Sequence, residues 1–238
     1  IVGISGYTIR PKRARKEKPK VSAFSSAKID KILDLKPDLV LGFSDIQSDI
    51  CSTLIKKGIN VLCFNQRSIS EILNVIKFLG KIIDKRDKSE NYVKNLEVYL
   101  KKIASSSKSL NKKPRVYFEE WDDPMITGIK WVSELIEIAG GIDIFKNLSS
   151  EPLASDRIIQ DPQDILNANP DIIIASWCGK KVNKEKIIAR NKWDKIRVVQ
   201  DNQIYEIKSP LILQPGPAAL TDGAKEIQDI IFRWKASI

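Results

Sequence analysis

The sequence predicts an α/β protein with two βαβ Rossmann-like lobes, a long connecting helix and a ligand cleft between the lobes. Short apolar runs alternate with amphipathic helical segments, which is typical of parallel sheets buried between helices. One unit, a helix closed by Pro-Asp and followed at once by an apolar strand, occurs at 31–42 and recurs with the same internal spacing at 164–175. Two copies around a long helical region indicate two related lobes, although helix-Pro-Asp-strand is also a common join in α/β proteins.

The N-terminal lobe is predicted over residues 1–67. Gly58 is expected to end the helix before it, because glycine is typical of helix C-termini. Pro37-Asp38 is expected to close the other helix, because proline disfavours a helical conformation in the preceding residue. A short apolar run such as Leu39–Gly42 is expected of a parallel strand buried on both faces. In chain order the expected elements are strand 1–5, an irregular basic arm over 10–19, helix 29–35, strand 39–42, helix 45–57 and strand 59–64.

A long helical region is predicted from residue 68 to about residue 105. Apolar residues hold one helical face on both sides of a charged break at 84–88. This region is longer than a single crossover requires, so we interpret 68–110 as a helical backbone between lobes and 111–238 as the C-terminal lobe.

The second lobe opens with RVYFEEWDDPMITGIKWVSELIEIAGG at 115–141. Residues 116–118 predict a buried strand, and 129–138 predict a helix that ends at Gly140-Gly141. Pro124 disfavours helix before it, so the acidic-aromatic cluster between them is expected on a loop at the strand's carboxyl end, where α/β sheets bind ligands. The alternative is a strand, loop and helix with solvated acids and tryptophans in the core.

A second strand-end loop, SWCGKK at 176–181, follows the apolar strand 170–175. It is predicted to occupy in this lobe the place that residues 43–45 occupy in the first lobe. Residues 196–199 and 203–207 are predicted as the last strands, and the proline-rich segment 209–217 leads to a final helix over 218–234.

Composition excludes several classes of function. Lys and Arg exceed Asp and Glu by 40 to 30, which favours anionic partners, but the aromatic-interleaved basic motifs of nucleic-acid-binding proteins are absent. No apolar run reaches the roughly 18 residues that a membrane helix needs. Histidine is absent, which excludes histidine-based zinc sites and catalytic triads. The three cysteines lack CxxC spacing; each is expected to pack as a small hydrophobe, although a pair could meet in the fold.

Catalytic readings of the chain rest on two features. The carboxylates at 119–123 are candidates for acid and base in glycoside hydrolysis or for holding a hard cation, but adjacent residues on a strand face opposite ways and no second acidic cluster stands out. Cys178, followed by Lys180 and Lys181, is expected to have a lowered pKa if exposed, yet it lacks a histidine base. The sequence therefore favours a binding cleft over a reaction.

Three motifs carry a family resemblance that extends over essentially the whole chain. YFEEWDDPMITGIKWVSELIEIAGG, SWCGKK and SPLILQPGPAALTDG resemble the cobalamin-binding subfamily of the periplasmic binding proteins that serve cobalamin, haem and iron-siderophore ABC importers. Members of that group have a helical backbone between lobes. They begin some 25 to 30 residues earlier, so the resemblance implies that a strand and a helix precede Ile1.

The resemblance implies a ligand site on the loops that face the cleft. Trp121 and Trp177 would stack on a flat macrocycle, and Arg67, Lys180 and Lys181 would meet carboxylate or phosphate. Haem gripped by histidine is excluded, because the chain has none. The residues carried over as ligand-binding are Tyr7, Arg10, Phe43, Asp45, Gln66, Arg67, Glu119, Glu120, Trp121, Asp122, Trp177, Lys180, Lys181 and Gln214.

The function expected from this resemblance is that of a solute-binding protein, not an enzyme. It would capture cobalamin or another metal chelate with modest hinge closure, require no cofactor, act as a periplasmic monomer and dock on a permease through Asp49 and Glu206; cobalamin-binding members carry Glu at the first of these positions. One alternative is a cytoplasmic binding protein of the same fold without a transporter. Another is an enzyme that uses Cys178 or the 119–123 cluster.

Overall fold

The computed structural model describes residues 1–237 and divides into two compact units, Ile1–Gln66 and Arg67–Ile238. Each unit combines strands with helices, so the predicted α/β class is confirmed. Helices α4 (Ile69–Ile82) and α5 (Arg86–Ser107), which lie in the predicted helical backbone 68–110, belong to the second compact unit. Among the described residues, no helix combines the length and apolar character that crossing a membrane demands.

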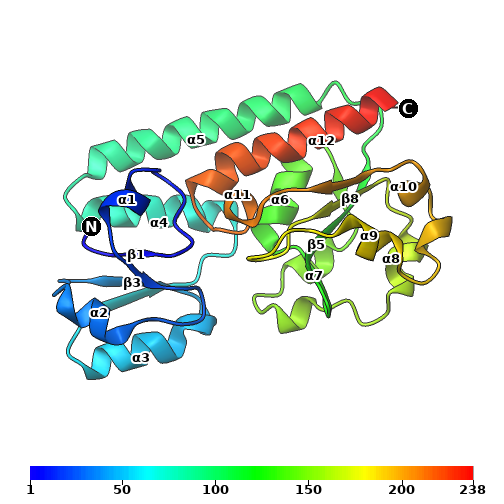
Figure 1. Cartoon of the computed structure of the whole chain (residues 1–238). Helices are drawn as coiled ribbons and strands as arrows, with labels where there is room; N and C mark the ends of the chain where they lie inside the picture. Colours follow the sequence, from blue (N-terminus) through cyan, green and yellow to red (C-terminus); the bar gives the residue numbers. More distant parts are fainter. Residues whose placement is uncertain (238) are drawn as a thin grey trace. The chain divides into compact units, whose positions relative to one another are not determined.

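Unit 1 contains two small parallel sheets, β1-β2 and β3-β4 (Figure 1). In the second of them Gly42 pairs with Cys63 and Phe43 with Phe64, so the two strands end together. The elements of unit 1 are β1 (Ile4–Ser5), α1 (Ala14–Glu17), β2 (Lys20–Ser22), α2 (Ile29–Asp34), β3 (Val40–Phe43), a 3-10 turn (Asp45–Gln47), α3 (Ser48–Lys56) and β4 (Val61–Phe64).

Two sequence predictions for unit 1 need correction. Strand β3 is not buried on both faces: α3 packs on the face that carries Gly42, whereas Leu41 on the other face is 50% exposed. The basic arm is not wholly irregular, because it contains the short helix α1. The guanidinium of Arg15 in that helix donates to the carbonyl oxygens of Gly6 and Thr8, each at 2.8 Å, and so holds the arm against the preceding loop.

Unit 2 is built on a five-stranded sheet of order β6-β5-β8-β9, with β7 paired to the start of β5. Only β6 is antiparallel. The elements are α4 (Ile69–Ile82), α5 (Arg86–Ser107), β5 (Arg115–Asp122), β6 (Met125–Thr127), α6 (Lys130–Ile138), β7 (Ile142–Asp143), α7 (Lys146–Ser149), a 3-10 turn (Ser155–Arg157), α8 (Gln163–Ala168), β8 (Ile172–Ala175), α9 (Lys184–Ile188), a 3-10 turn (Trp193–Lys195), α10 (Arg197–Gln200), β9 (Ile204–Glu206), α11 (Ser209–Ile212), a π-helical turn (Ala219–Gly223) and α12 (Ala224–Ser237).

The long helical region is two helices rather than one. Helix α4 begins with a capping box between Ser68 and Glu71 and ends where Asp84 adopts a positive φ of 53°. Helix α5 then packs back along α4, and Gly80 makes the close approach possible: a Cβ at that position would lie 2.3 Å from the Cβ of Ser89. The charged break that the sequence shows is therefore a tight turn, and α5 alone is the long helix.

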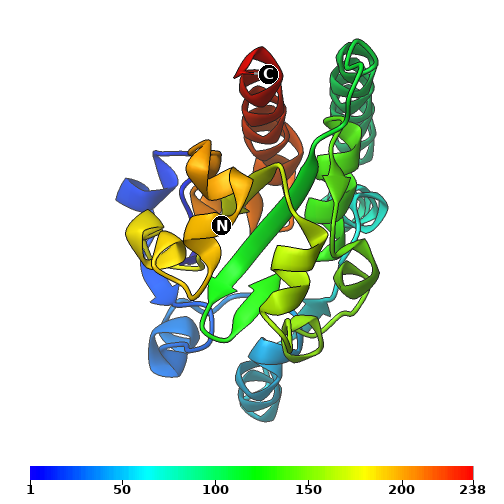
Figure 2. The same cartoon turned by 90° about the vertical axis from the view of Figure 1, so that its right-hand side faces the viewer.

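Alternate residues of β5 and β8 face two different layers of helices, which Figure 2 shows on either side of β5. Tyr117, Ile173 and Ala175 point into a buried cluster with Ile165 of α8, Ile187 of α9 and Trp193. On the opposite face, Val116 and Phe118 pack toward α6 and α12. The sheet is therefore covered on both faces, as the apolar strand sequences predict.

Two further predictions for unit 2 are wrong. The acidic-aromatic cluster is not a loop, because β5 continues through Asp122 and turns at Asp123-Pro124 into β6. Antiparallel pairing with β6 satisfies the backbone of these residues. Residues 197–200 form the helix α10 and not a strand; β9 is the edge strand of the sheet.

Candidate ligand-binding site

The side chains at the carboxyl end of β5 and in the segment after β8 form one charged cluster. The side chain of Asp122 is 1% exposed, and its two carboxylate oxygens accept hydrogen bonds from Lys180 Nζ at 2.5 Å and Lys186 Nζ at 2.6 Å. Burial alone would raise the pKa of Asp122, but the hydrogen bonds from the two ammonium groups outweigh it and lower that pKa. Asp122 therefore stays ionised and fixes two lysines whose own side chains are about half exposed.

Lys180 also lies over two indole rings. Its Nζ is 4.0 Å from the ring centroid of Trp121 and 4.9 Å from that of Trp177. The Trp121 ring is half-buried, and its Nε1 donates to the carbonyl oxygen of Asp123 at 2.9 Å, which fixes the ring orientation. The surface at this point presents an aromatic ring beside an ammonium group, a combination that suits a ligand with both a flat apolar part and an anionic part.

Glu119 belongs to the interior of unit 2. It is 0% exposed and accepts hydrogen bonds from Tyr117 Oη and Trp177 Nε1, each at 3.0 Å. The guanidinium of Arg190 donates to both of its oxygens, at 2.5 and 2.9 Å. All four lone-pair directions of this carboxylate are thus used inside the protein.

This arrangement corrects two of the predicted ligand contacts. Trp177 is 2% exposed and packs in the core cluster of unit 2, so it has no free face for a flat macrocycle. Glu119 is likewise a buried partner of Arg190, not a ligand-facing acid. Their role is to position the segment after β8, which brings Lys180 over Trp121.

Glu120 faces the opposite side of β5 from Glu119, as the alternation of a strand predicts. Arg157, which is buried, donates to Glu120 Oε2 at 2.6 Å and to the carbonyl oxygen of Thr127, also at 2.6 Å. No group of three or more metal-binding side chains occurs in the part of the chain that the structure describes. The acidic cluster is thus divided among separate ion pairs, and the hard-cation reading gains no support from it.

The Cys178 thiol does not have the lowered pKa that its neighbouring lysines suggested. Partial burial, and then the negative charge of Glu120, raise the pKa of Cys178 above its ordinary value. The Lys180 ammonium group donates its hydrogen bond to Asp122 and not to the Cys178 sulfur. The thiolate form is therefore disfavoured, which removes the basis for a nucleophilic Cys178.

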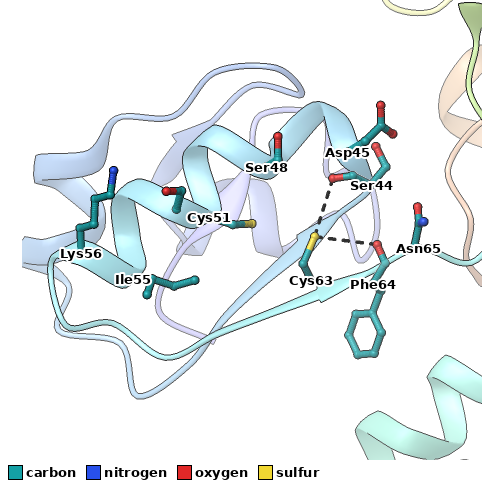
Figure 3. Close-up of a pocket in the computed structure, with 10 residues that line it drawn as sticks. Ser44, Asp45, Ser48, Cys51, Ile55, Lys56, Cys63, Phe64 and Asn65 are labelled. Atoms are coloured by element: carbon teal, nitrogen blue, oxygen red, sulfur yellow. Dashed lines mark hydrogen bonds between the residues drawn. The ribbon is translucent and has the colours of Figure 1, made fainter.

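In unit 1 the predicted residues lie at the carboxyl ends of β3 and β4. A shallow pocket of about 550 Å³ opens there between these strand ends and α3 (Figure 3), and Asp45 and Asn65 are among its lining residues. Ser44 holds the turn with a positive φ of 65°, and its Oγ accepts a hydrogen bond from the backbone N–H of Ile46. Phe43 is half-buried and Gln66 is buried.

The remaining predicted residues are distributed over both units. Tyr7 and Arg10 are exposed in unit 1, and Asp49 is exposed in the first turn of α3. In unit 2, Lys181 is exposed and Arg67 and Gln214 are half-buried. Glu206 is half-buried at the end of β9, and its Oε1 accepts a hydrogen bond from the backbone N–H of Val182 at 3.2 Å.

Two residues of the charged cluster were missed from the sequence. Lys186 lies in helix α9 and Arg190 follows two residues after its end, and they reach Asp122 and Glu119 of β5, respectively. The only available signal was their spacing in a short, charged segment, which is also the pattern of a solvated helix face. Their partners are more than 60 residues earlier in the chain.

Comparisons with known proteins identify the family. A periplasmic binding protein family profile (Peripla_BP_2) matches residues 1–211. The uncharacterized ABC transporter substrate-binding lipoprotein YvrC of Bacillus subtilis is 27% identical over 98% of this chain and 73% of its own length. The vitamin B12-binding protein of Vibrio parahaemolyticus is 22% identical over 92% of this chain and 78% of its own length.

Among solved structures, an ABC transporter substrate-binding protein from Listeria monocytogenes superposes with a TM-score of 0.81 at 21% identity, covering 97% of this chain and 90% of its own. That likeness bears on the fold, including its two lobes and long helix. The match of the family profile extends over most of the sequence, from the first strand to helix α11. The chain therefore belongs to the periplasmic binding protein family.

Proposed function

We propose that this protein is the substrate-binding component of an ABC importer and that it captures cobalamin or a related metal chelate for delivery to a permease. The observation that carries the proposal is the Lys180 ammonium held over the half-buried Trp121 ring. A corrin or similar chelate offers a broad apolar surface with polar and anionic groups at its edge. Such a ligand matches an indole ring and a lysine that are fixed side by side.

The residues that we propose for ligand binding lie on loops and strand ends within each of the two units. In unit 1 we propose Tyr7 and Arg10 together with the strand-end residues Phe43, Asp45 and Gln66; of these, Asp45 lines the pocket at the ends of β3 and β4. In unit 2 we propose Trp121 and Lys180 together with Arg67, Lys181 and Gln214. Asp122 and Glu120 act by holding Lys180 and Arg157, so they contribute through position and not through contact.

Membership in a family of binding proteins argues against an enzyme. The name of the Bacillus subtilis relative supports a transport role, and together with the family description it supports a place on the outer side of the cytoplasmic membrane, free or lipid-anchored. The chelate would be the cargo, and no resident cofactor is needed. Because the chain has no histidine, a ligand that requires histidine at its metal is excluded.

Docking on the permease is proposed through one acidic residue on each unit. Asp49 is exposed in the first turn of α3. Among the described contacts, its carboxylate accepts no hydrogen bond from a backbone N–H. Glu206 is half-buried and shares one oxygen with Val182, so its second oxygen is the one available to an arginine of the permease. We expect Asp49→Asn to weaken docking more than Glu206→Gln.

Isothermal titration calorimetry with cyanocobalamin tests the proposed ligand. Trp121→Ala and Lys180→Ala are each expected to weaken binding about tenfold, which corresponds to about 1.4 kcal/mol. Lys112→Ala is a matched control, because Lys112 Nζ also lies over an indole ring, that of Trp234, at 5.5 Å. The control should bind like the wild type.

Two outcomes would count against the proposal. Absence of saturable heat with cobalamin and with a panel of haem and ferric siderophores would remove the metal-chelate class. Binding that Lys112→Ala weakens as much as Lys180→Ala would move the site away from the end of β5.

A further inference from the structure

Two of the three cysteines meet inside unit 1. Cys51 lies on α3 and Cys63 on β4, and Figure 3 shows the Cys51 side chain extending from α3 toward the strand that carries Cys63. Gly42 pairs with Cys63 in the β3-β4 register and lies directly beneath the pair. A Cβ placed on Gly42 would lie 2.8 Å from the Cys51 sulfur and 3.4 Å from the Cys63 sulfur. Both sulfur atoms therefore lie within 3.4 Å of one point.

The absent side chain of Gly42 is what leaves room for the two thiols. A methyl group there would collide with the Cys51 sulfur, because 2.8 Å is shorter than any ordinary carbon-sulfur contact. The contact also affects the titration of Cys63. Burial first, and then the hydrogen bond and the charge of Cys51, raise the pKa of the Cys63 thiol, with a further contribution from Asp45.

The two thiols differ in access. Cys51 is buried, whereas Cys63 is exposed and lines the pocket at the strand ends. The Cys63 sulfur also approaches the carbonyl oxygen of Ser44 at 3.7 Å, which keeps it on the α3 side of the sheet. An external reagent is therefore expected to react with Cys63 first. The Cys51 thiol lies next to Cys63.

A metal would need more ligands than this pair offers. Structural zinc takes four protein ligands, and the described residues hold no cluster of three or more metal-binding side chains. Two adjacent thiols with a single exposed member, and without further ligands, are instead the arrangement of a disulfide in its reduced form.

We propose that Cys51 and Cys63 are a disulfide-forming pair that links α3 to β4 at the wall of the unit 1 pocket. The oxidant is a low-molecular-weight disulfide. The raised pKa of Cys63 leaves only a small fraction of it as thiolate, and this fraction attacks one sulfur atom of the reagent, forms a mixed disulfide and releases the first thiol. The Cys51 thiolate then attacks the Cys63 sulfur and displaces the second thiol. The two protein thiols lose two electrons and two protons, and the reagent is reduced to two thiols.

The experiment uses the whole folded protein and oxidised glutathione, followed by alkylation, intact mass measurement and peptide mapping. The expected product has lost two hydrogen atoms, contains a peptide that links Cys51 to Cys63, and carries alkylated Cys178. Dithiothreitol should reverse the change. The inference does not depend on which ligand the protein binds, so its outcome is separate from that of the cobalamin titration.

Three variants sharpen the test. Cys51→Ser should leave a stable glutathione adduct on Cys63, whereas Cys63→Ser should leave Cys51 unreacted. Gly42→Ala should slow closure of the disulfide, because its methyl group would displace the Cys51 sulfur. Oxidation should raise the thermal midpoint of the wild type and not that of Cys51→Ser. A lasting glutathione adduct on wild-type Cys63, or a product that links Cys178, would overturn the proposal.

Discussion

Replacement of Arg190 by methionine tests the interpretation of Glu119 as a buried structural acid. The Arg190 guanidinium binds both oxygens of Glu119, which has no exposure to solvent. It also stacks over Trp193 at 4.7 Å from the ring centroid. Methionine keeps much of the apolar stem but removes the charge. Glu119 would then keep only the hydroxyl of Tyr117 and the indole N–H of Trp177.

The expected loss is large because a buried charge is left without its partner. Removing one member of a buried ion pair costs about 3–5 kcal/mol, whereas replacing both members can be nearly neutral. Arg190→Met should therefore lower the free energy of unfolding of unit 2 by about 3–5 kcal/mol. The double variant Glu119→Gln with Arg190→Met should recover most of that loss.

The assay is urea unfolding followed by tryptophan fluorescence. All five tryptophans lie after residue 120, so the signal reports unit 2 alone. Arg197→Met is the matched control, because Arg197 pairs with Asp201 but its side chain is 78% exposed; its effect should stay within about 0.5 kcal/mol. A loss below about 1 kcal/mol for Arg190→Met, or a double variant no more stable than the single one, would refute the reasoning.

Two other substitutions probe the packing and titration of unit 2. Gly80→Ala should cost about 1–3 kcal/mol in urea unfolding, since the new methyl collides with Ser89, and adding Ser89→Gly should restore part of it. Burial raises the pKa of Asp143 above its ordinary value of 3.8, so its stabilising contribution is complete below that pH and is lost as pH rises through the folded pKa. Asp143→Asn should thus exceed the wild type in stability at neutral pH and match it below pH 3.8; a difference that does not vary with pH would contradict this.

The sequence was informative where local patterns decide the structure. The apolar run at 170–175 and the amphipathic segment at 129–138 predicted strand β8 (Ile172–Ala175) and helix α6 (Lys130–Ile138) to within two residues, because burial of such runs outweighs other preferences. The acidic stretch at 119–122 was less predictable. Its backbone forms a strand because β6 pairs with it. A hairpin partner of three residues is too short to be recognised from the amino-acid composition.

The site was predicted less fully than the fold, and the reason is long-range pairing. Trp177 and Glu119 carry the residue types of a ligand site, yet each satisfies the other's hydrogen bond across 58 positions. Arg190 completes that pair from 71 positions away. Local sequence periodicity does not indicate partners this far apart. A single sequence therefore does not distinguish the residues of a buried ion pair from those of an exposed binding site.

Asp122 offers a test in which position and simple charge predict opposite signs. If the ligand presents an anionic group to Lys180, removing a nearby negative charge should strengthen binding by Coulomb attraction alone. The side chain of Asp122, however, is 1% exposed, and its two carboxylate oxygens form ion pairs with Lys180 and Lys186. Asp122→Asn gives up an ionic hydrogen bond to each lysine and frees Lys180 from its place over Trp121.

We therefore expect Asp122→Asn to weaken binding of an anionic chelate by up to about tenfold, or about 1.4 kcal/mol, in calorimetric titration. Asp123→Asn is the control: Asp123 is the next residue and is exposed, so its loss should change affinity little or raise it slightly. If both variants bind more tightly, Lys180 meets the ligand as a mobile charge, and the buried carboxylate has no part in positioning it. If only Asp122→Asn loses affinity, the ligand recognises a lysine that the sheet holds in place.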